Sequence, residues 1–398
     1  MNRIYIFTGK GGVGKSSVAA AHAVKSAGEG KRTLLVSTDM AHNLGDLFEK
    51  DLGRTVEKDV LPYLDLYEID PEYVMDNDFP SVMEYLGKLF SDLGEPELQN
   101  MGMIPGMEEL FSLLKIADIY KKEYYDRIIV DCAPTGETLS LLKFPELLSW
   151  YMEKLFPIGK VGVRVLAPIS KAAFKVEMPN RYAVNEIEKI YLKLADLQEL
   201  LKNRDITSVR IVAIPEKMVV EETKRNYMYL NLYNFNVDGL YINRILPAEI
   251  DNPFFSGWLT LQRQYITLLQ DCFGALPIYE IPWYDEELKG EGAIRRIVED
   301  VLDGEEVFAL KNITERESFR QTEKGYELEV FLPNGDKEKM ELYQAASDIV
   351  IKTDNFKRNI PLPNVLRNYN VSGAKYKNEK LSIWFERGSE EHGQGDAS

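Results

Sequence analysis

The sequence predicts an α/β protein built on a doubly wound, mainly parallel sheet, with helical insertions and a C-terminal all-β sandwich. Up to about residue 303, short apolar runs rich in β-branched residues alternate with stretches of helical length. Beyond residue 304, apolar residues instead recur at every second position. With 398 residues, 45% of them hydrophobic, the chain can bury one large core or two smaller ones.

Seven apolar runs are the expected strands of the parallel sheet. They cover residues 3–8, 32–38, 64–69, 127–130, 209–214, 239–242 and 278–281. Because helix-length stretches separate these runs, we expect the strands to pair mainly in parallel.

Two long stretches between the expected strands have helical periodicity and no strand signal. They are residues 71–122 and 144–203, and we expect them to add a helical layer to the sheet. Methionines gather in the first stretch, at Met75, Met83, Met101, Met103 and Met107. Flexible thioethers suit a groove that accepts many apolar sequences, although ordinary core packing explains single methionines equally well.

The residues beyond 304 are expected to form a separate β domain. Alternating apolar residues stand at Tyr326, Leu328, Val330 and Leu332. Asn334, followed by glycine, is a strong hairpin signal. We expect a linker over residues 304–325, a β-sandwich over residues 326–386 and a disordered tail over residues 387–398.

Charge and cysteine content exclude several classes of protein. The formal net charge of −16 argues against broad electrostatic binding of nucleic acid or anionic lipid. Cys132 and Cys272 offer neither a disulfide framework nor a CxxC metal site, as expected in a reducing compartment. No apolar run approaches the ~18 residues of a membrane-spanning helix, and early glycines interrupt any signal peptide. We expect a soluble cytoplasmic protein that keeps its N-terminus.

Residues 9–16, GKGGVGKS, fit the G-x-x-x-x-G-K-[ST] pattern of a phosphate-binding loop between a strand and a helix. Its glycines let backbone amides turn toward the β-phosphate, and Lys15 bridges the β- and γ-phosphates. Ser16 supplies a hydroxyl to Mg²⁺. The motif predicts a P-loop NTPase that binds ATP through Gly9, Lys10, Gly11, Gly12, Val13, Gly14, Lys15, Ser16 and Ser17.

Lys10 is an additional lysine at the second position of this loop. It is expected to point away from the nucleotide that its own loop holds, and so to reach the phosphates of a second protomer, as an arginine finger does in trans. This interpretation requires a homodimer. A solvated loop lysine is the alternative.

Further motifs resemble the family of arsenical-pump ATPases and tail-anchored-protein targeting ATPases, within the deviant Walker A class. The resemblance covers residues 1 to about 303. Its motifs are DMAHNLGD at residues 39–46, PGMEE at 105–109, DCAPTGET at 131–138, Pro215-Glu216 with Glu222 and Arg225, Asn243 in YINRIL, and PWYDEELKG at 282–290.

The family resemblance implies a role for each site residue. Asp39 would orient the attacking water, with a helix N-cap as the alternative, and Asp131 would act with Ser16 on Mg²⁺. Gly136 would meet the γ-phosphate through its backbone amide, because glycine permits that close approach. The remaining roles are a composite nucleotide pocket for Glu216, adenine recognition for Asn243 and closure over the base for the loop that begins at Pro282.

Departures from the family pattern narrow the function. Met40, Cys132 and Glu137 replace residues that are usual in the two switches, and the CxxC zinc pair of the eukaryotic targeting factors is absent. An arsenite-efflux subunit is disfavoured, because arsenite favours three sulfur ligands and two separate cysteines cannot supply them. A MinD-like regulator of membrane surfaces would need a C-terminal membrane helix, which is not visible. The intact loop argues against a holdase without ATPase activity.

Residues 326–386 resemble the α-crystallin domain of small heat-shock proteins through YELEVFLP, IVIKTDNFKRNIPLPNVL and KLSIWF. The two resemblances together imply a homodimeric, Mg²⁺-dependent ATPase. Its expected partners are a second copy of the chain and hydrophobic segments of membrane or aggregation-prone proteins, with a membrane receptor as a further candidate and no nucleic acid.

Overall fold

The computed structural model describes residues 2–39, 43–80, 107–132, 192–193, 195–250, 252–273, 276–310, 317–345, 348–353, 356–362, 366 and 369–387. The chain divides into two compact units. Unit 1 comprises Met1–Thr223 and Asn236–Leu310, and unit 2 comprises Lys224–Phe235 and Lys311–Ser398. Gly136, the greater part of both expected insertions and residues 388–398 of the expected C-terminal tail lie outside the described residues.

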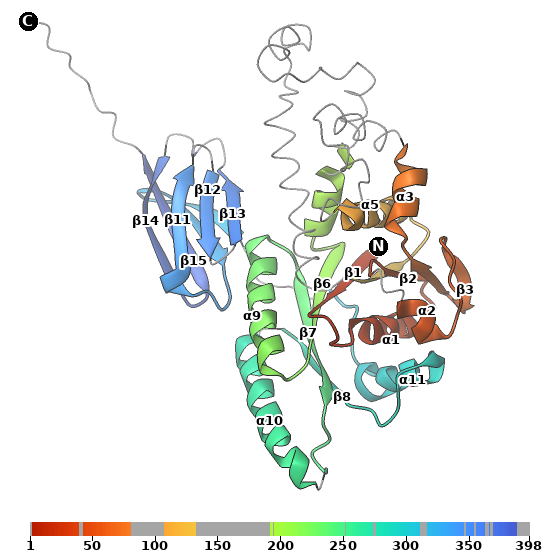
Figure 1. Ribbon diagram of the computed structural model, residues 1–398. Coiled ribbons are helices and arrows are strands. Elements are labelled where there is room, and N and C mark those ends of the chain that lie inside the picture. The colour runs from red at the N-terminus through yellow and green to blue at the C-terminus, as the bar shows by residue number, and fades with distance from the viewer. Residues whose placement is uncertain are drawn as a thin grey trace, which may run out of the picture. The chain divides into compact units, whose positions relative to one another are not determined.

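Unit 1 contains an eight-stranded sheet in the order β3-β4-β2-β5-β1-β6-β7-β8 (Figure 1). Its strands are β1 (Arg3–Thr8), β2 (Thr33–Ser37), β3 (Glu57–Leu61), β4 (Leu64–Glu68), β5 (Arg127–Asp131), β6 (Thr207–Ala213), β7 (Val237–Ile245) and β8 (Ile278–Pro282). Each neighbouring pair of these strands is parallel except β3 and β4. The predicted fold class is confirmed, and all seven expected strands are present.

Strand β3 is the one strand of this sheet that the sequence analysis missed. Its residues, EKDVL, are largely exposed, and it pairs only at the margin of the sheet. Short, charged strands of this kind are usual at sheet edges, where they discourage pairing with other chains. They have no apolar alternation from which a strand could be predicted.

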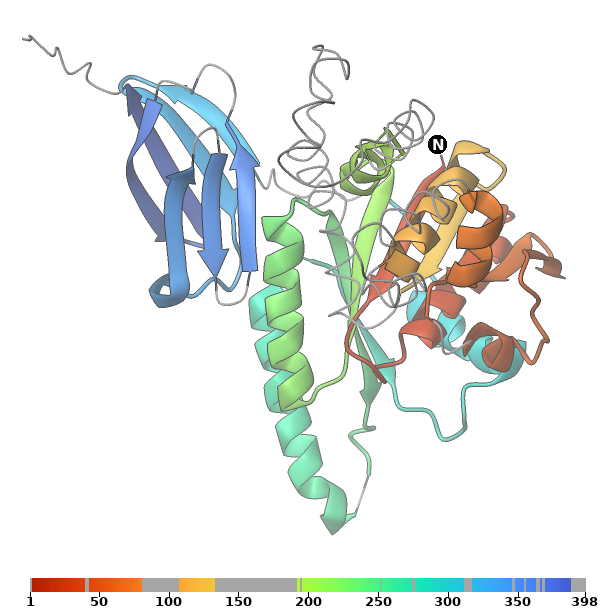
Figure 2. The same cartoon turned by 45° about the horizontal axis from the view of Figure 1, so that its top comes forward.

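The helices of the described chain cover both faces of the sheet. They are α1 (Lys15–Gly28), α2 (Asn43–Phe48), α3 (Pro71–Asp78), α5 (Met107–Lys121), α9 (Lys217–Leu232), α10 (Pro253–Phe273), α11 (Gly290–Ile297) and the π-helix η3 (Val298–Leu302). The chain moves across the sheet in opposite directions after β1 and after β7, so right-handed crossovers place α1 and α10 on opposite faces. Figures 1 and 2 both show this arrangement, with α11 beside α1.

The described parts of the two expected insertions are helical. Helices α3 and α5 lie in the first, and they pack together through the rings of Phe79 and Phe111, whose centroids are 4.9 Å apart. Residues 195–202, in the second, are also helical. Within the described residues, no helix combines the length and the apolar composition that crossing a bilayer requires.

Unit 2 contains an antiparallel β-sandwich, as predicted. Its two sheets have the orders β14-β15-β10-β9 and β11-β12-β13. The strands are β9 (Glu317–Thr322), β10 (Gly325–Phe331), β11 (Met340–Ala345), β12 (Asp348–Thr353), β13 (Phe356–Pro361), β14 (Tyr369–Lys377) and β15 (Lys380–Arg387), and a 3₁₀ helix, η4 (Lys337–Lys339), precedes β11. The core includes Leu328, Val330, Ile349, Ile351 and Phe385.

The described parts of the expected linker, residues 304–310 and 317–325, are structured. Its C-terminal part forms β9 and the turn into β10, while residues 304–310 belong to unit 1. There the backbone carbonyl of Phe308 accepts hydrogen bonds from Arg3 and Tyr5, and that of Val307 accepts one from Arg210. So short a segment has no periodicity to reveal its packing in the sequence.

Candidate functional site

The phosphate loop joins β1 to α1, and two of its glycines are required by their surroundings. A Cβ on Gly9 would collide with the carbonyl oxygen of Val212, and a Cβ on Gly14 would collide with the side-chain nitrogen of Asn243. Gly12 has φ +80° and open space where its Cβ would stand. The loop therefore leaves its backbone exposed toward a cavity, at the N-terminus of α1 where an anion is stabilised.

The cavity in front of the loop has a volume of about 420 Å³. It lies at the carboxyl edge of the parallel sheet, where ligands bind in open α/β folds. Its lining consists of Gly11, Gly12, Gly14, Lys15, Ser16, Ser17, Asp39, Asp46, Leu47, Arg244, Glu287, Leu288 and Lys289. Seven of these are predicted site residues, so the structure brings the loop and Asp39 of the first switch to one place.

Asp131 ends β5 beside this cavity and is 1% exposed. Neither of its carboxylate oxygens has a hydrogen-bond partner among the described residues. Burial raises the pKa of Asp131 to about 6, against the opposing effects of the Ser16 hydroxyl and the Lys15 ammonium, while Asp39 adds to the rise. An unpaired buried carboxylate beside a serine hydroxyl fits the Mg²⁺ that accompanies ATP in such enzymes.

Cys132 follows Asp131 and is also buried. Burial, together with the neighbouring carboxylate of Asp131, raises the pKa of its thiol to about 12. Cys132 is therefore a neutral thiol at physiological pH and a weak nucleophile. No group of three histidine, cysteine or acidic side chains suited to a metal ion occurs in the part of the chain that the structure describes.

Lys10 does not line the cavity. Its ammonium lies 3.7 Å from the carboxylate of Glu222, and both side chains are partly exposed. Lys15 lines the cavity, so it is the lysine placed to bind the phosphates of its own loop, as the motif suggests. Its action on a second protomer remains a prediction.

Asn243 lies behind the loop rather than in the described cavity, and it is 4% exposed. Its side-chain nitrogen donates to the carbonyl oxygen of Val13 at 2.9 Å, and its side-chain oxygen accepts from the amide of Arg244 at 2.9 Å. It therefore supports the loop and the turn that presents Arg244 to the cavity. Adenine recognition by Asn243 remains a prediction.

Two other predicted residues lie away from the cavity. Glu216 is exposed just before α9. Pro282, at the end of β8, borders a separate cavity of about 560 Å³ between α10 and the segment after β7. Their roles in a composite pocket and in closure over the base remain predictions.

Sequence reasoning gave no individual role to six residues that line the cavity. They are Asp46, Leu47, Arg244, Glu287, Leu288 and Lys289. Asp46 closes the first switch motif, and residues 287 and 289 lie in the PWYDEELKG motif, so both motifs contained the signal. Arg244 follows Asn243 and has a left-handed φ of 57°. No pattern in the sequence predicts this backbone conformation.

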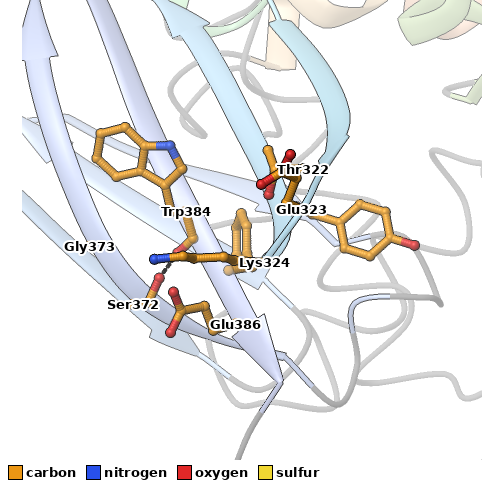
Figure 3. A pocket seen from close by; sticks show the side chains of 9 residues that line it. Thr322, Glu323, Lys324, Ser372, Gly373, Trp384 and Glu386 are labelled. Atoms are coloured by element: carbon orange, nitrogen blue, oxygen red, sulfur yellow. Dashed lines mark hydrogen bonds between the residues drawn. The ribbon is translucent and has the colours of Figure 1, made fainter.

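Unit 2 contains a cavity of its own, of about 510 Å³, at one end of the sheet β14-β15-β10-β9 (Figure 3). Trp384 packs against Gly373 at a β-bulge of β14, and Ser372 donates a hydrogen bond to the Trp384 carbonyl at 3.3 Å. Glu323 and Glu386 also line it. The phosphate loop with Lys15 lines the cavity of unit 1 instead, so that cavity is the nucleotide site.

Comparisons with known proteins agree with both units. Residues 2–303 match the family model described as anion-transporting ATPase, and residues 323–385 match an HSP20-like domain found in ArsA. The chain is 30% identical over 393 residues to an Aquifex aeolicus protein that is named as an arsenical pump-driving ATPase, covering 96% of this chain and 99% of that one.

Two further relatives extend the comparison. A Chlorobaculum tepidum protein with the same type of name is 33% identical over 389 residues, covering 96% of each chain. ATPase GET3C of Arabidopsis thaliana is 32% identical over 318 residues, covering 74% of this chain and 80% of that one. The site geometry and these matches lead to one conclusion: the chain belongs to the anion-transporting ATPase family and is an ATP-hydrolysing enzyme with an HSP20-like C-terminal domain.

Proposed function

We propose that this ATPase works as a Mg²⁺-dependent homodimer in which ATP binding and hydrolysis switch a binding site for hydrophobic protein segments. It would serve in the cytoplasm as a targeting factor or chaperone for membrane or aggregation-prone proteins, with a membrane receptor as a further partner. The observation that supports this proposal best is the different placement of the two loop lysines. Lys15 lines the cavity, whereas Lys10 stands outside it.

The residues of the cavity have complementary tasks in this proposal. The loop amides and Lys15 hold the phosphates, and Ser16 and Asp131 would hold Mg²⁺. When bound, Mg²⁺ neutralises phosphate charge. Asp39 follows β2 and lines the cavity, where its carboxylate would orient the attacking water. Lys10 of the second protomer would stabilise the charge that develops on the transferred phosphoryl group, so hydrolysis would require the dimer.

The proposed clients follow from the helical insertions and from the motif resemblance to tail-anchored-protein targeting ATPases. A groove for a transmembrane segment must cover ~20 apolar residues, more than one protomer's insertion is expected to line. Client binding should then depend on the ATP-bound dimer. The relatives' arsenical-pump names do not change this proposal, because Cys132 is a buried neutral thiol and Cys272 lies apart on α10.

The test uses Asp39→Asn, which keeps the size of the side chain and removes its negative charge. Turnover is expected to fall by ~10² or more while ATP remains bound. With ATP, this variant should capture a 20-residue hydrophobic-helix peptide, and without nucleotide it should not. The same peptide with two central lysines is the matched control. Equal capture by nucleotide-free wild type and by the ATP-loaded variant would contradict the proposal.

A further inference from the structure

The first switch is attached to the sheet on both of its sides. Ser37 on β2 and Glu68 on β4 are register partners in adjacent parallel strands. The hydroxyl of Ser37 accepts a hydrogen bond from the amide of Asp39 at 3.1 Å. In the C-terminal part of the switch, one carboxylate oxygen of Glu68 accepts from the amides of Leu44 and Gly45, at 2.7 and 3.0 Å.

Glu68 is well suited to hold this segment. It is 7% exposed, and its strand ends there with the amide of Ile69 bonded to the carbonyl of Ser37, so its backbone is rigid. The two amides that it accepts belong to the first turn of α2, where backbone N–H groups have no partner within the helix. A carboxylate at this end makes short, charge-assisted hydrogen bonds.

Helix α2 in turn carries residues of the nucleotide cavity. Asp46 and Leu47 line that cavity together with Asp39, whereas Glu68 does not. Glu68 borders a neighbouring cavity of about 420 Å³, which it shares with Asp46. The contacts of Glu68 with Leu44 and Gly45 connect it to the nucleotide cavity through α2.

We propose that Glu68 is a positioning residue for ATP hydrolysis, which anchors α2 so that Asp39 and Asp46 face the phosphate end of the nucleotide cavity. The inference rests on the catalytic role proposed for Asp39. A displacement of about 1 Å in a catalytic group can lower the rate ~10²-fold, so a lost anchor should affect turnover more than binding.

A close backbone contact of α2 with Lys50 gives a second way to disturb the position of the helix. A Cβ on Gly45 would stand 2.9 Å from the carbonyl oxygen of Lys50. The carbonyl of Gly45 accepts from the amide of Lys50 at 2.9 Å, so this backbone is held from two directions. Gly45→Ala should therefore displace the first turn of α2, whose amides donate to Glu68, without changing any acceptor.

The experiment compares Glu68→Ala, Glu68→Gln and Gly45→Ala in the full-length chain. Turnover, KM, ATP affinity and the melting temperature are measured for each. Glu68→Ala and Gly45→Ala are expected to lower kcat about tenfold or more while the Kd for a non-hydrolysable ATP analogue changes by less than about threefold. Glu68→Gln retains a side-chain oxygen that can accept both amides, so it should restore most of the turnover.

Asp65→Ala is the matched control. Asp65 lies on the same strand and is similarly buried, but its carboxylate is bonded to Lys58 and Tyr125, at 2.6 and 2.7 Å, and it does not line the nucleotide cavity. This change should lower the melting temperature as much as Glu68→Ala does and leave kcat near the wild-type value. A purely structural role of Glu68 would give the two variants the same kinetics.

The outcomes separate this inference from the proposed function. Wild-type kcat in folded Glu68→Ala, beside an inactive Asp39→Asn, overturns the positioning role alone. A Glu68→Gln variant as slow as Glu68→Ala also overturns it, since the acceptor would then be irrelevant. Wild-type turnover in Asp39→Asn overturns the catalytic role of Asp39. If Glu68→Ala does not fold, wild-type kcat in folded Gly45→Ala overturns the inference.

Discussion

The side-chain amide of Asn243 donates a hydrogen bond of 2.9 Å to the carbonyl oxygen of Val13, which ties β7 to the phosphate loop. The two residues are 230 positions apart in the chain. A Cβ on Gly14 would occupy the place of the same side-chain nitrogen. The shape of the loop therefore depends on a residue that no loop motif includes.

Replacement of Asn243 should weaken the binding of phosphates, whatever base is attached. Asn243→Ala removes a buried hydrogen bond worth about 1–2 kcal/mol, which corresponds to about a tenfold loss of affinity. Isothermal titration should show this loss for ATP and for inorganic triphosphate alike. A loss confined to ATP would mean that Asn243 acts on the adenine instead. Asn236→Ala is the control, because Asn236 is equally buried just before the same strand and bonds to Ser208.

Lys10 should be needed for turnover and not for binding. Lys10→Ala is expected to bind ATP with near-normal affinity and to lose most of its ATPase activity, because its cavity is lined without Lys10. Mixing it with Asp39→Asn should restore part of the activity, since one composite site is then intact. Phosphate release from verified mixed dimers measures this, and an absence of rescue would contradict the action in trans.

Glu222 provides a companion variant. Its carboxylate lies 3.7 Å from the Lys10 ammonium in the single chain and would compete with a second protomer's phosphates for it. Glu222→Gln is therefore expected to keep turnover at or above the wild-type level. If Glu222→Gln is as inactive as Lys10→Ala, the ion pair itself is required, and the transfer of Lys10 between protomers is wrong.

Truncated chains should show that the ATPase unit extends to residue 310. A chain of residues 1–310 is expected to fold with near-normal ATPase activity, because the β-sandwich has its own core. A chain of residues 1–303 loses the carbonyl of Val307 that accepts from buried Arg210. An acceptor lost to a buried charged donor costs about 2–3 kcal/mol, so the shorter chain should melt at least several degrees lower.

Point variants in the full-length chain check the same segment. The Phe308 ring lies 3.8 Å from the Arg127 guanidinium and edge-on to Tyr5, at a centroid distance of 5.2 Å. Phe308→Ala should therefore lower the melting temperature, whereas Leu310→Ala, at a position 49% exposed, should not. If 1–303 and 1–310 melt at the same temperature, these contacts are unimportant.

Asp131→Asn should stabilise the nucleotide-free protein at neutral pH. Burial raises the pKa of Asp131 from 3.8 to about 6, so the folded state is penalised for the ionised carboxylate by about 3 kcal/mol at pH 7.5. Because the folded state binds this proton more tightly, the penalty shrinks as the pH falls through 6 toward 4. The melting temperature of the variant should exceed that of the wild type at pH 7.5 and approach it near pH 4.5. An equal difference at both pH values would contradict this explanation.

The sequence by itself determined the features that depend on neighbouring residues. The glycines and Lys15 of the phosphate loop lie between a strand and a helix, as their spacing predicts, and the period of two after residue 325 forms a β-sandwich. Both signals are local, because a loop conformation or a strand face is set by residues within a few positions of one another. The edge strand β3 had no such signal, since its charged residues face solvent.

Only the tertiary structure decided which distant residues support the site. Asn243 reaches Val13 because β7 lies two strands from β1, and Glu68 reaches α2 because β4 pairs with β2. Likewise, Arg3 on β1 donates a hydrogen bond to the carbonyl of Phe308, and Arg210 on β6 donates one to the carbonyl of Val307. Such contacts follow from the order of strands in the sheet. Local periodicity specifies which segments become strands, whereas their order depends on the packing of the whole unit.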